Sequence, residues 1–139
     1  MTKIYLDTEF NGFQGELISM GLVAEDGSEF YEVLPYEHMS IDPWVENHVI
    51  PILNKDPVCL ATFREKLKNY LLQFSEIVIV ADWPEDIQHF CAMLITGPGQ
   101  RIPTPGMTFI MDPNLPNTSQ YSKIPHNALE DARALISHG

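Results

Sequence analysis

Apolar residues in the first third of the chain fall in short runs that are typical of strands. Residues 3–6, 16–24 and 28–34 each combine apolar and β-branched or aromatic side chains, and they predict three strands. The pair Asp26-Gly27 lies between the second and third runs, and this dipeptide is typical of a hairpin turn because glycine tolerates a positive φ. We therefore expect the chain to begin as an antiparallel meander.

Helical and strand patterns alternate in the next part of the chain. Residues 42–49 predict a short helix, and Pro51 should end it. From Leu60 to Phe74 apolar residues recur at three- and four-residue spacing, with charged residues largely opposite, which predicts a helix with one buried face. Residues 76–81 (EIVIVA) form a continuous apolar run that is typical of a central strand covered on both faces.

A third helix is expected to begin directly after this central strand, in the run Asp82-Trp83-Pro84-Glu85. Asp82 is a candidate N-cap, and Glu85 three positions later would complete a capping box. We expect Gly97 to end that helix. Residues 98–106 predict a loop, residues 107–111 a fifth strand, residues 113–125 a second loop and residues 128–136 a last helix.

This order of elements predicts an α/β fold. Right-handed crossovers make the later strands parallel to the first, which gives a mixed five-stranded sheet of order 3-2-1-4-5 flanked by helices. That is the ribonuclease H-like arrangement, expected here as a single domain over residues 1–139. In such sheets the functional site lies beyond the carboxyl ends of the parallel strands, here just after Leu6 and Ala81.

Composition and charge narrow the function classes. No apolar run approaches the ~18 residues that a membrane span needs, and no signal-peptide pattern is seen, so we expect a cytoplasmic protein without a membrane partner. Cys59 and Cys91 are too few for a disulfide framework and are expected to be buried thiols. The net charge of -11 argues against a long nucleic-acid track, but it leaves open carboxylates that hold divalent cations, which in turn meet phosphates.

Acidic residues stand at the two predicted strand ends. Asp7 and Glu9 are two residues apart on the first strand, so their side chains should point to the same face. Asp82 and Asp86 follow the central strand, and either could be the acid that meets Asp7. Because Asp82 has an alternative explanation as a helix cap, we favour Asp86 as the ligand.

The last helix adds a third group of polar residues. Asp131 falls about 40° from Leu135 on a helical wheel, so it flanks the apolar stripe rather than facing open water. His126 comes one residue before the expected cap, Asn127, at the end of a loop. A lone histidine is more often structural than catalytic. Here, however, His126 occurs in the same chain as the acidic residues described above.

Taken together, these residues resemble the motifs of the DEDDh 3'-5' exonucleases. The resemblance consists of D-x-E on the first strand, an Asp at the start of the helix after the fourth strand, and H-x-A-x-x-D on the last helix, and it spans residues 4–134. The runs YLDTEF, ELISMGLVAEDG and HNALEDAR resemble the compact bacterial and phage exoribonuclease-like branch. The chain departs from the family at residues 80–86, where VADWPED replaces the usual A-H-N-A-x-F-D.

The resemblance implies a metal-dependent 3'-5' exonuclease that releases nucleoside 5'-monophosphates from short single-stranded RNA or DNA. Two Mg²⁺ or Mn²⁺ ions would be bound by carboxylates, and His126 would be the general base. The implied metal ligands are Asp7, Glu9, Asp86 and Asp131. From their positions beside the acids, Phe10, Asn11, Gly12 and Trp83 are the candidates to contact a terminal base.

Other functions remain open at this point. A ribonuclease H-like endonuclease would not need the H-x4-D pair, and a two-carboxylate glycosidase would leave Asp131 and His126 without a role. A catalytically silent nuclease fold could serve as a nucleic-acid-binding or regulatory module, although no acid of the pattern is missing. The preference between ribose and deoxyribose, and whether the chain forms a homodimer, are open as well.

Overall fold

Strand β1 (Thr2–Phe10) is the centre of the fold, because it pairs with a neighbour along each edge. The structure is a computed structural model that describes residues 1–138. β1 runs antiparallel to β2 (Leu17–Ala24) and parallel to β4 (Glu76–Ala81). β3 (Glu29–Val33) continues the antiparallel side, and β7 (Gly106–Met111) continues the parallel side.

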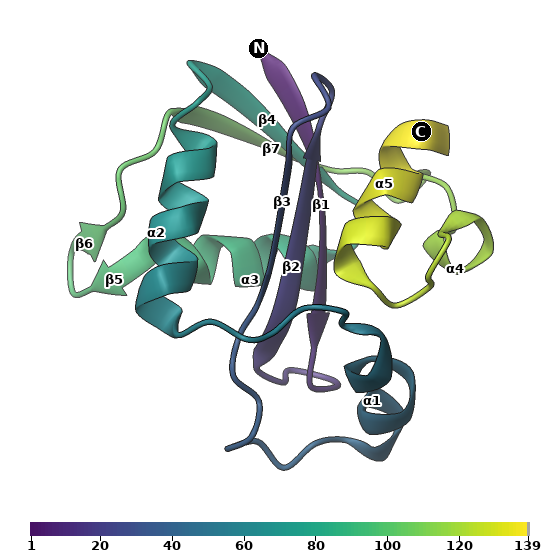
Figure 1. Cartoon of the computed structure of the whole chain (residues 1–139). Helices are drawn as coiled ribbons and strands as arrows, with labels where there is room; N and C mark the ends of the chain where they lie inside the picture. Colours follow the sequence, from purple (N-terminus) through teal and green to yellow (C-terminus); the bar gives the residue numbers. More distant parts are fainter. Residues whose placement is uncertain (139) are drawn as a thin grey trace.

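The sheet therefore has the order β3-β2-β1-β4-β7 (Figure 1). This confirms the predicted α/β fold and its ribonuclease H-like strand order, with β7 as the fifth strand of the sheet. The Asp26-Gly27 turn between β2 and β3 is confirmed as well, with Gly27 at a φ of 93°.

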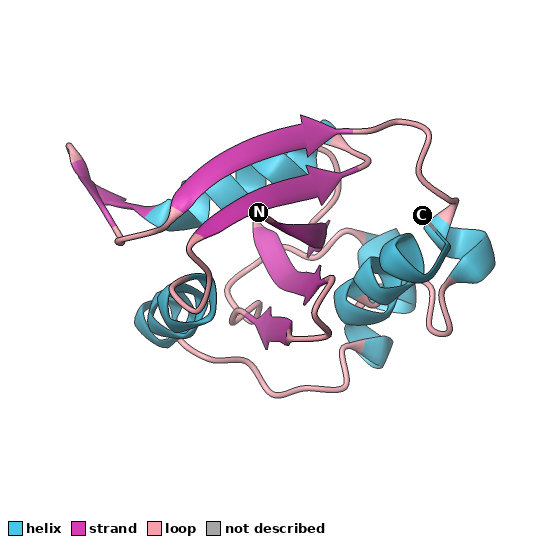
Figure 2. Cartoon of the chain, turned by 90° about the horizontal axis from the view of Figure 1, so that it is seen from above, coloured by secondary structure: helices cyan, strands magenta, loops and turns pink. Residues whose placement is uncertain are grey.

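Helices cover both faces of the sheet, and α2 and α5 lie on opposite sides of it (Figure 1; Figure 2 gives the view from above). The helices are α1 (Pro43–His48), α2 (Leu60–Leu71), α3 (Pro84–Leu94), α4 (Thr118–Tyr121) and α5 (Ala128–His138), with a 3-10 turn at Ile50–Ile52. Within residues 1–138 no helix has both the length and the apolar character that crossing a membrane requires.

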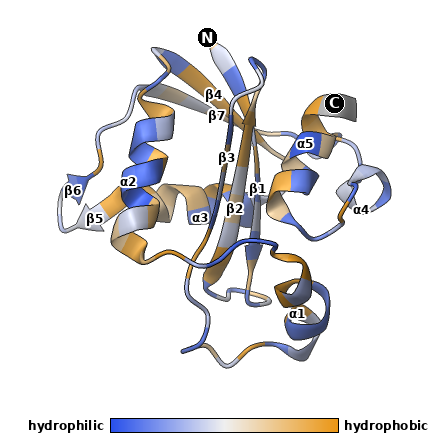
Figure 3. Cartoon of the chain, viewed as in Figure 1, coloured by the Kyte–Doolittle hydropathy of each residue, from blue (hydrophilic) through white to orange (hydrophobic). Residues whose placement is uncertain are grey.

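One face of the sheet forms the main apolar core. Ile4 and Leu6 of β1 are fully buried there, in one cluster with Phe63 of α2 and Phe90 of α3. Figure 3 shows β4 as apolar along most of its length, whereas polar and apolar residues alternate along α2. Because side chains alternate along a strand, Asp7 and Glu9 point to the other face of β1, toward α5.

Several local predictions were wrong. β1 does not end at Leu6 but continues to Phe10, because β2 remains paired with it as far as Phe10 opposite Leu17. α3 ends at Leu94 rather than Gly97, and the expected loop after it contains a short hairpin, β5 (Ile95–Gly97) and β6 (Gln100–Arg101). The loop before α5 contains α4.

The expected capping box at α3 and the expected burial of Cys59 were also wrong. The N-cap of α3 is Trp83, and no side chain caps this helix. Asp82 is therefore not the cap, and Glu85 instead accepts hydrogen bonds from the Trp83 indole N–H and the Gln14 backbone N–H. Cys59 is exposed because it is the N-cap residue of α2, at the end of a loop, while Cys91 is half-buried.

Gly21 of β2 determines how closely α5 approaches the sheet. A Cβ atom at this position would lie 2.5 Å from the Ala128 carbonyl oxygen and 2.7 Å from the Leu129 backbone nitrogen. Only glycine permits this contact between two backbones. Since Gly21 is also the partner of Asp7 in the β1–β2 register, it places the start of α5 beside Asp7.

We therefore expect Gly21→Ala to move α5 away from the sheet and to lower the free energy of unfolding by about 1–3 kcal/mol, the usual cost of overpacking. Urea denaturation measures this loss. Gly106→Ala in β7 is the matched control, because a Cβ there would meet only the Glu76 Cγ atom, at 3.9 Å. Equal stabilities of the two variants would contradict the role assigned to Gly21.

Candidate metal centre

Five acidic side chains from four parts of the chain meet at one end of the sheet. They form two groups, and within each group one ligand oxygen per residue lies within 4.8 Å of the others. Asp7 belongs to both groups, so it stands where a ligand shared between two cations would stand. The groups are Asp7, Glu9 and Asp131, and Asp7, Asp82 and Asp86.

The end of strand β4 creates the space for the second group. β4 pairs with β1 only from Thr2 to Tyr5, and the chain then leaves the sheet toward α3. Beyond this point a side chain replaces the missing strand: Asp86 Oδ1 accepts hydrogen bonds from the Thr8 hydroxyl at 2.6 Å and the Thr8 backbone N–H at 3.3 Å. Asp86 is thereby fixed against β1, next to Asp7.

The first group depends on how α5 begins. Asn127 Oδ1 accepts a hydrogen bond from the Glu130 backbone N–H at 3.1 Å, which confirms Asn127 as the expected cap. The Asn127 side chain also donates to the Ile52 carbonyl oxygen at 2.9 Å, so the 3-10 turn and α5 are joined. With Gly21 beneath it, the first turn of α5 brings Asp131 to Asp7 and Glu9.

His126 lies beside Asp131 at the end of the preceding loop. Its backbone N–H donates to Asp131 Oδ2 at 3.2 Å, and its φ is 74°, in the left-handed region. The imidazole packs edge-on against the Trp44 ring, with ring centres 4.8 Å apart, and Trp44 in turn stacks on His48 at 4.6 Å. The orientation of His126 is thus held by both its backbone and its ring.

Burial and mutual repulsion dominate the electrostatics of the site. Burial, followed by the charges of neighbouring acids, raises the pKa of Asp7 and of Glu9 well above the usual range. Burial also raises the pKa of Asp131, and it raises the pKa of Asp86 to about 7 in spite of the hydrogen bonds from Thr8. Cations close to the oxygens would reverse this penalty.

The polar atoms of the site fit divalent cations. Asp7 Oδ2 and Asp131 Oδ1 are buried and have no hydrogen-bond partner. No lysine or arginine among residues 1–136 forms an ion pair with any of the five acids. Carboxylate oxygens are the ligands that Mg²⁺ and Mn²⁺ prefer. The donor set, its charge and its unpaired oxygens are all suited to such ions.

The predicted substrate-contacting residues lie next to Glu9. A cavity of about 430 Å³ borders Glu9 and is lined by aromatic side chains of three segments, among them Phe10, Trp44 and Trp83. Trp83 is 56% exposed, and Glu85 fixes its indole N–H at 3.0 Å. The amide of Asn11 is engaged in hydrogen bonds with Ser40 and Asp42, and Gly12 has a φ of 75°.

Three residues of the site were missed by the sequence analysis. Thr8 fixes Asp86, Trp44 supports His126, and Gly21 allows α5 to approach. A glycine inside an apolar strand pattern is a known sign of close backbone approach, so Gly21 could have been found. Thr8 and Trp44 act through contacts with residues far away in the sequence, and no local pattern identifies them.

The raised pKa values predict how the stability of the ion-free protein depends on pH. A carboxyl whose pKa is higher in the folded than in the unfolded state stabilises the fold at low pH, and this contribution is lost as the pH rises through the folded value. In EDTA we expect the free energy of unfolding to fall between pH 5 and pH 8, the interval that contains the Asp86 pKa of about 7. Each proton released contributes up to about 1.4 kcal/mol per pH unit.

Denaturant titrations at pH 5 and pH 8 measure this slope. Asp86→Asn should reduce it, since the amide oxygen can still accept from Thr8 but carries no titrating proton. Asp56→Asn, in an exposed loop, should leave the slope unchanged. The same stability for the wild type at both pH values would contradict the assigned pKa shifts.

Comparison with known proteins supports the 3'-5' exonuclease part of the resemblance seen in the sequence. No protein-family model matches the chain. The chain is 30% identical over 146 residues to a 3'-5' exoribonuclease of Mycobacterium tuberculosis strain H37Rv, and the match covers 94% of this chain and 87% of the relative. The 3'-5' exoribonuclease of strain CDC 1551 has the same identity and coverage. With this identity over nearly the whole length of both proteins, the chain belongs to the family of these 3'-5' exoribonucleases.

Proposed function

We propose that the protein is a metal-dependent 3'-5' exoribonuclease that hydrolyses phosphodiester bonds at the 3' end of short single-stranded RNA. The observation that carries the proposal is the pair of carboxylate groups that share Asp7. A site for two neighbouring divalent ions needs such a shared ligand, and the name of the relatives supports the same reaction. Nucleoside 5'-monophosphates are the expected products.

The metal ligands in this proposal are four buried or half-buried acids of the three motifs. Asp7 would contact both ions, and Mg²⁺ or Mn²⁺ would be held by Asp7, Glu9, Asp86 and Asp131. When bound, two such ions provide Lewis-acid activation of water and neutralise the charge that develops on the phosphate and the leaving oxygen. The carboxylates hold their positions because β1, α3 and α5 are fixed by hydrogen bonds and close packing.

His126 is the proposed general base. A neutral imidazole has one ring nitrogen without a proton, so the His126 ring can accept the proton of the attacking water. The contact with Trp44 and the backbone hydrogen bond to Asp131 limit the positions that the ring can take. His126 is also half-buried, at the end of a loop, where it can exchange protons with solvent.

Substrate would be held by stacking rather than by basic residues. The exposed Trp83 and the half-buried Phe10 border the cavity beside Glu9. Aromatic rings stack on bases irrespective of the base sequence. Asn11 and Gly12 would shape the loop that follows Phe10, since Asn11 ties this loop to Ser40 and Asp42. With a net charge of -11, contact with only a few terminal nucleotides is expected.

The direct test of the function compares two labelled substrates. In Mn²⁺, the protein should release labelled mononucleotide at once from a 3'-labelled oligoribonucleotide, whereas a 5'-labelled one should shorten step by step. Internal cleavage would instead indicate an endonuclease, and binding without cleavage would indicate a silent module. An oligodeoxyribonucleotide of the same sequence measures whether DNA is also a substrate.

Asp7→Asn should abolish cleavage, because Asp7 belongs to both carboxylate groups. The fold should persist, since the change relieves repulsion in the ion-free site. Circular dichroism and the rate of mononucleotide release measure the two effects. Asp56→Asn is the control and should keep full activity. Wild-type activity in Asp7→Asn would refute the assigned site.

His126→Ala should slow turnover by roughly 10²- to 10⁴-fold, the usual loss when a general base is removed. Binding of Mn²⁺ and of RNA should change little, so the effect should appear in kcat rather than in KM. His38→Ala removes an exposed histidine that contacts Glu16 and is the matched control. An unchanged kcat in His126→Ala would leave His126 with a structural role only.

A further inference from the structure

We propose that Asp82 is a fifth carboxylate ligand of the metal centre, which holds one divalent cation together with Asp7 and Asp86. The inference rests on the proposed nuclease function and extends it. The motifs that the chain shares with the DEDDh exonucleases account for four acids, and Asp82 lies in the segment where this chain departs from them. The proposal therefore assigns a role to a residue that is particular to this sequence.

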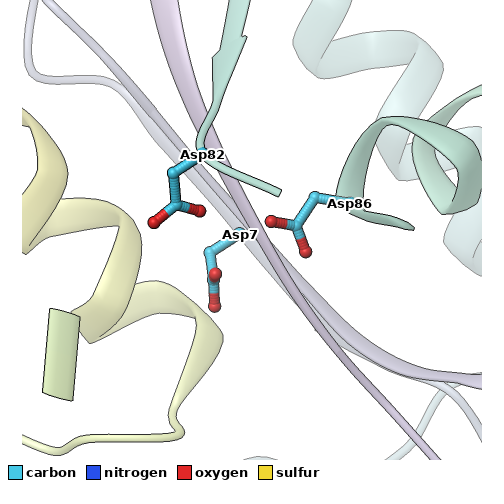
Figure 4. A group of neighbouring side chains, drawn as sticks. All are labelled: Asp7, Asp82 and Asp86. Atoms are coloured by element: carbon cyan, nitrogen blue, oxygen red, sulfur yellow. The ribbon is translucent and has the colours of Figure 1, made fainter. Parts of the chain in front are cut away.

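The first argument is the geometry of the carboxylates. Figure 4 shows Asp82 and Asp86 on either side of Asp7, with the carboxylate of each directed toward the space around Asp7. One oxygen from each of the three side chains lies within 4.8 Å of the other two. The three residues come from the end of β4, the first turn of α3 and the middle of β1, so their meeting is a product of the fold and not of sequence proximity.

The second argument is an oxygen without a partner. Asp7 is 8% exposed, and its Oδ2 atom is buried and accepts no hydrogen bond. Burying a carboxylate oxygen without a donor is costly, and a cation is the group that removes this cost most completely. The unpaired oxygen thus indicates a cation at Asp7, which is a member of the group that it forms with Asp82 and Asp86.

The third argument is that Asp82 has no other task. It does not cap α3, whose N-cap is Trp83 and which has no side-chain cap. Within residues 1–136 its side chain receives no hydrogen bond from another residue and pairs with no lysine or arginine. It is half-buried beside other acids, which is unfavourable in a protein that holds no cation.

The hydrogen bonds of Asp86 show why a third carboxylate is useful there. Both contacts from Thr8 fall on Oδ1 of Asp86, so this oxygen is already engaged and Oδ2 is the one left for an ion. Asp82 would supply a further oxygen and a further negative charge. Ligand charge is one of the main factors that set the affinity of an oxygen-ligand site. We expect the site of Asp7, Asp82 and Asp86 to depend on all three.

The test measures Mn²⁺ binding without nucleic acid, by isothermal titration and by the electron paramagnetic resonance signal of free Mn²⁺. The wild type should bind two ions. Asp82→Asn should weaken one of them by at least about 10- to 100-fold, the loss seen when even an outer-shell partner of a metal ligand is removed. The other ion, at Asp7, Glu9 and Asp131, should keep its affinity within a few fold.

Asp112→Asn is the matched control. Asp112 follows β7 as Asp82 follows β4, and its backbone N–H donates to the Ala81 carbonyl oxygen, directly before Asp82. Its side chain accepts from the Asn114 backbone N–H and belongs to neither carboxylate group. This variant should bind two Mn²⁺ ions as the wild type does. Asp82→Glu, which keeps the charge, should recover part of the lost affinity, and it provides a second measurement if Asp82→Asn folds poorly.

Binding of two Mn²⁺ ions by Asp82→Asn with wild-type affinity would overturn the inference, whatever the protein does to RNA. Loss of affinity in Asp112→Asn as large as in Asp82→Asn would overturn it too. A wild-type protein that binds two ions, one of them dependent on Asp82, but cleaves no RNA would refute the proposed function and leave the inference about Asp82 standing. The two failures are therefore distinguishable.

Discussion

The unfavourable burial of carboxylates beside one another is the constraint on which the rest of the structure depends. Asp7, Asp86 and Asp131 are each buried to more than nine-tenths, and no lysine or arginine among residues 1–136 pairs with them. Groups that repel each other in a poorly hydrated place stay together only where the surrounding backbone cannot give way. The sheet and its helices keep the backbone in place, so the three carboxylates stay close together in spite of their repulsion.

The rigidity comes from contacts between backbones and from hydrogen bonds to the backbone more than from apolar packing at the site itself. β2 pairs with one edge of β1 along the whole D-x-E motif. On the other edge β4 has ended, and the Asp86 side chain accepts a hydrogen bond from the β1 backbone there. α5 lies directly on the backbone of β2 at Gly21, and Asn127 joins its start to the 3-10 turn. Each acid is thus attached to an element that is held in place by at least one contact that needs no bound ion.

The parts that were predictable from the sequence are those set by local patterns. Alternation along β1 placed Asp7 and Glu9 on one face, and the strand order followed from the alternation of strands with helices and from crossover handedness. Asp82 was misjudged because capping preferences consider only neighbours in sequence, whereas its surroundings are set by Asp7, 75 positions away in the chain. Thr8 and Trp44 were missed for the same reason. The β5–β6 hairpin was missed because its strands are too short to show an alternation of apolar and polar residues.

The clustered negative charge also affects how an acidic protein would bind a negatively charged nucleic acid. With 19 Asp and Glu against 8 Lys and Arg, the surface repels phosphates at long range. Attraction would then arise only at the candidate metal centre, where bound cations would largely neutralise the acids and present positive charge directly to phosphate oxygens, and at the aromatic rings beside Glu9, which need no charge to hold a base. A site of this kind favours a chain end that enters the cavity over a long strand that lies along the surface.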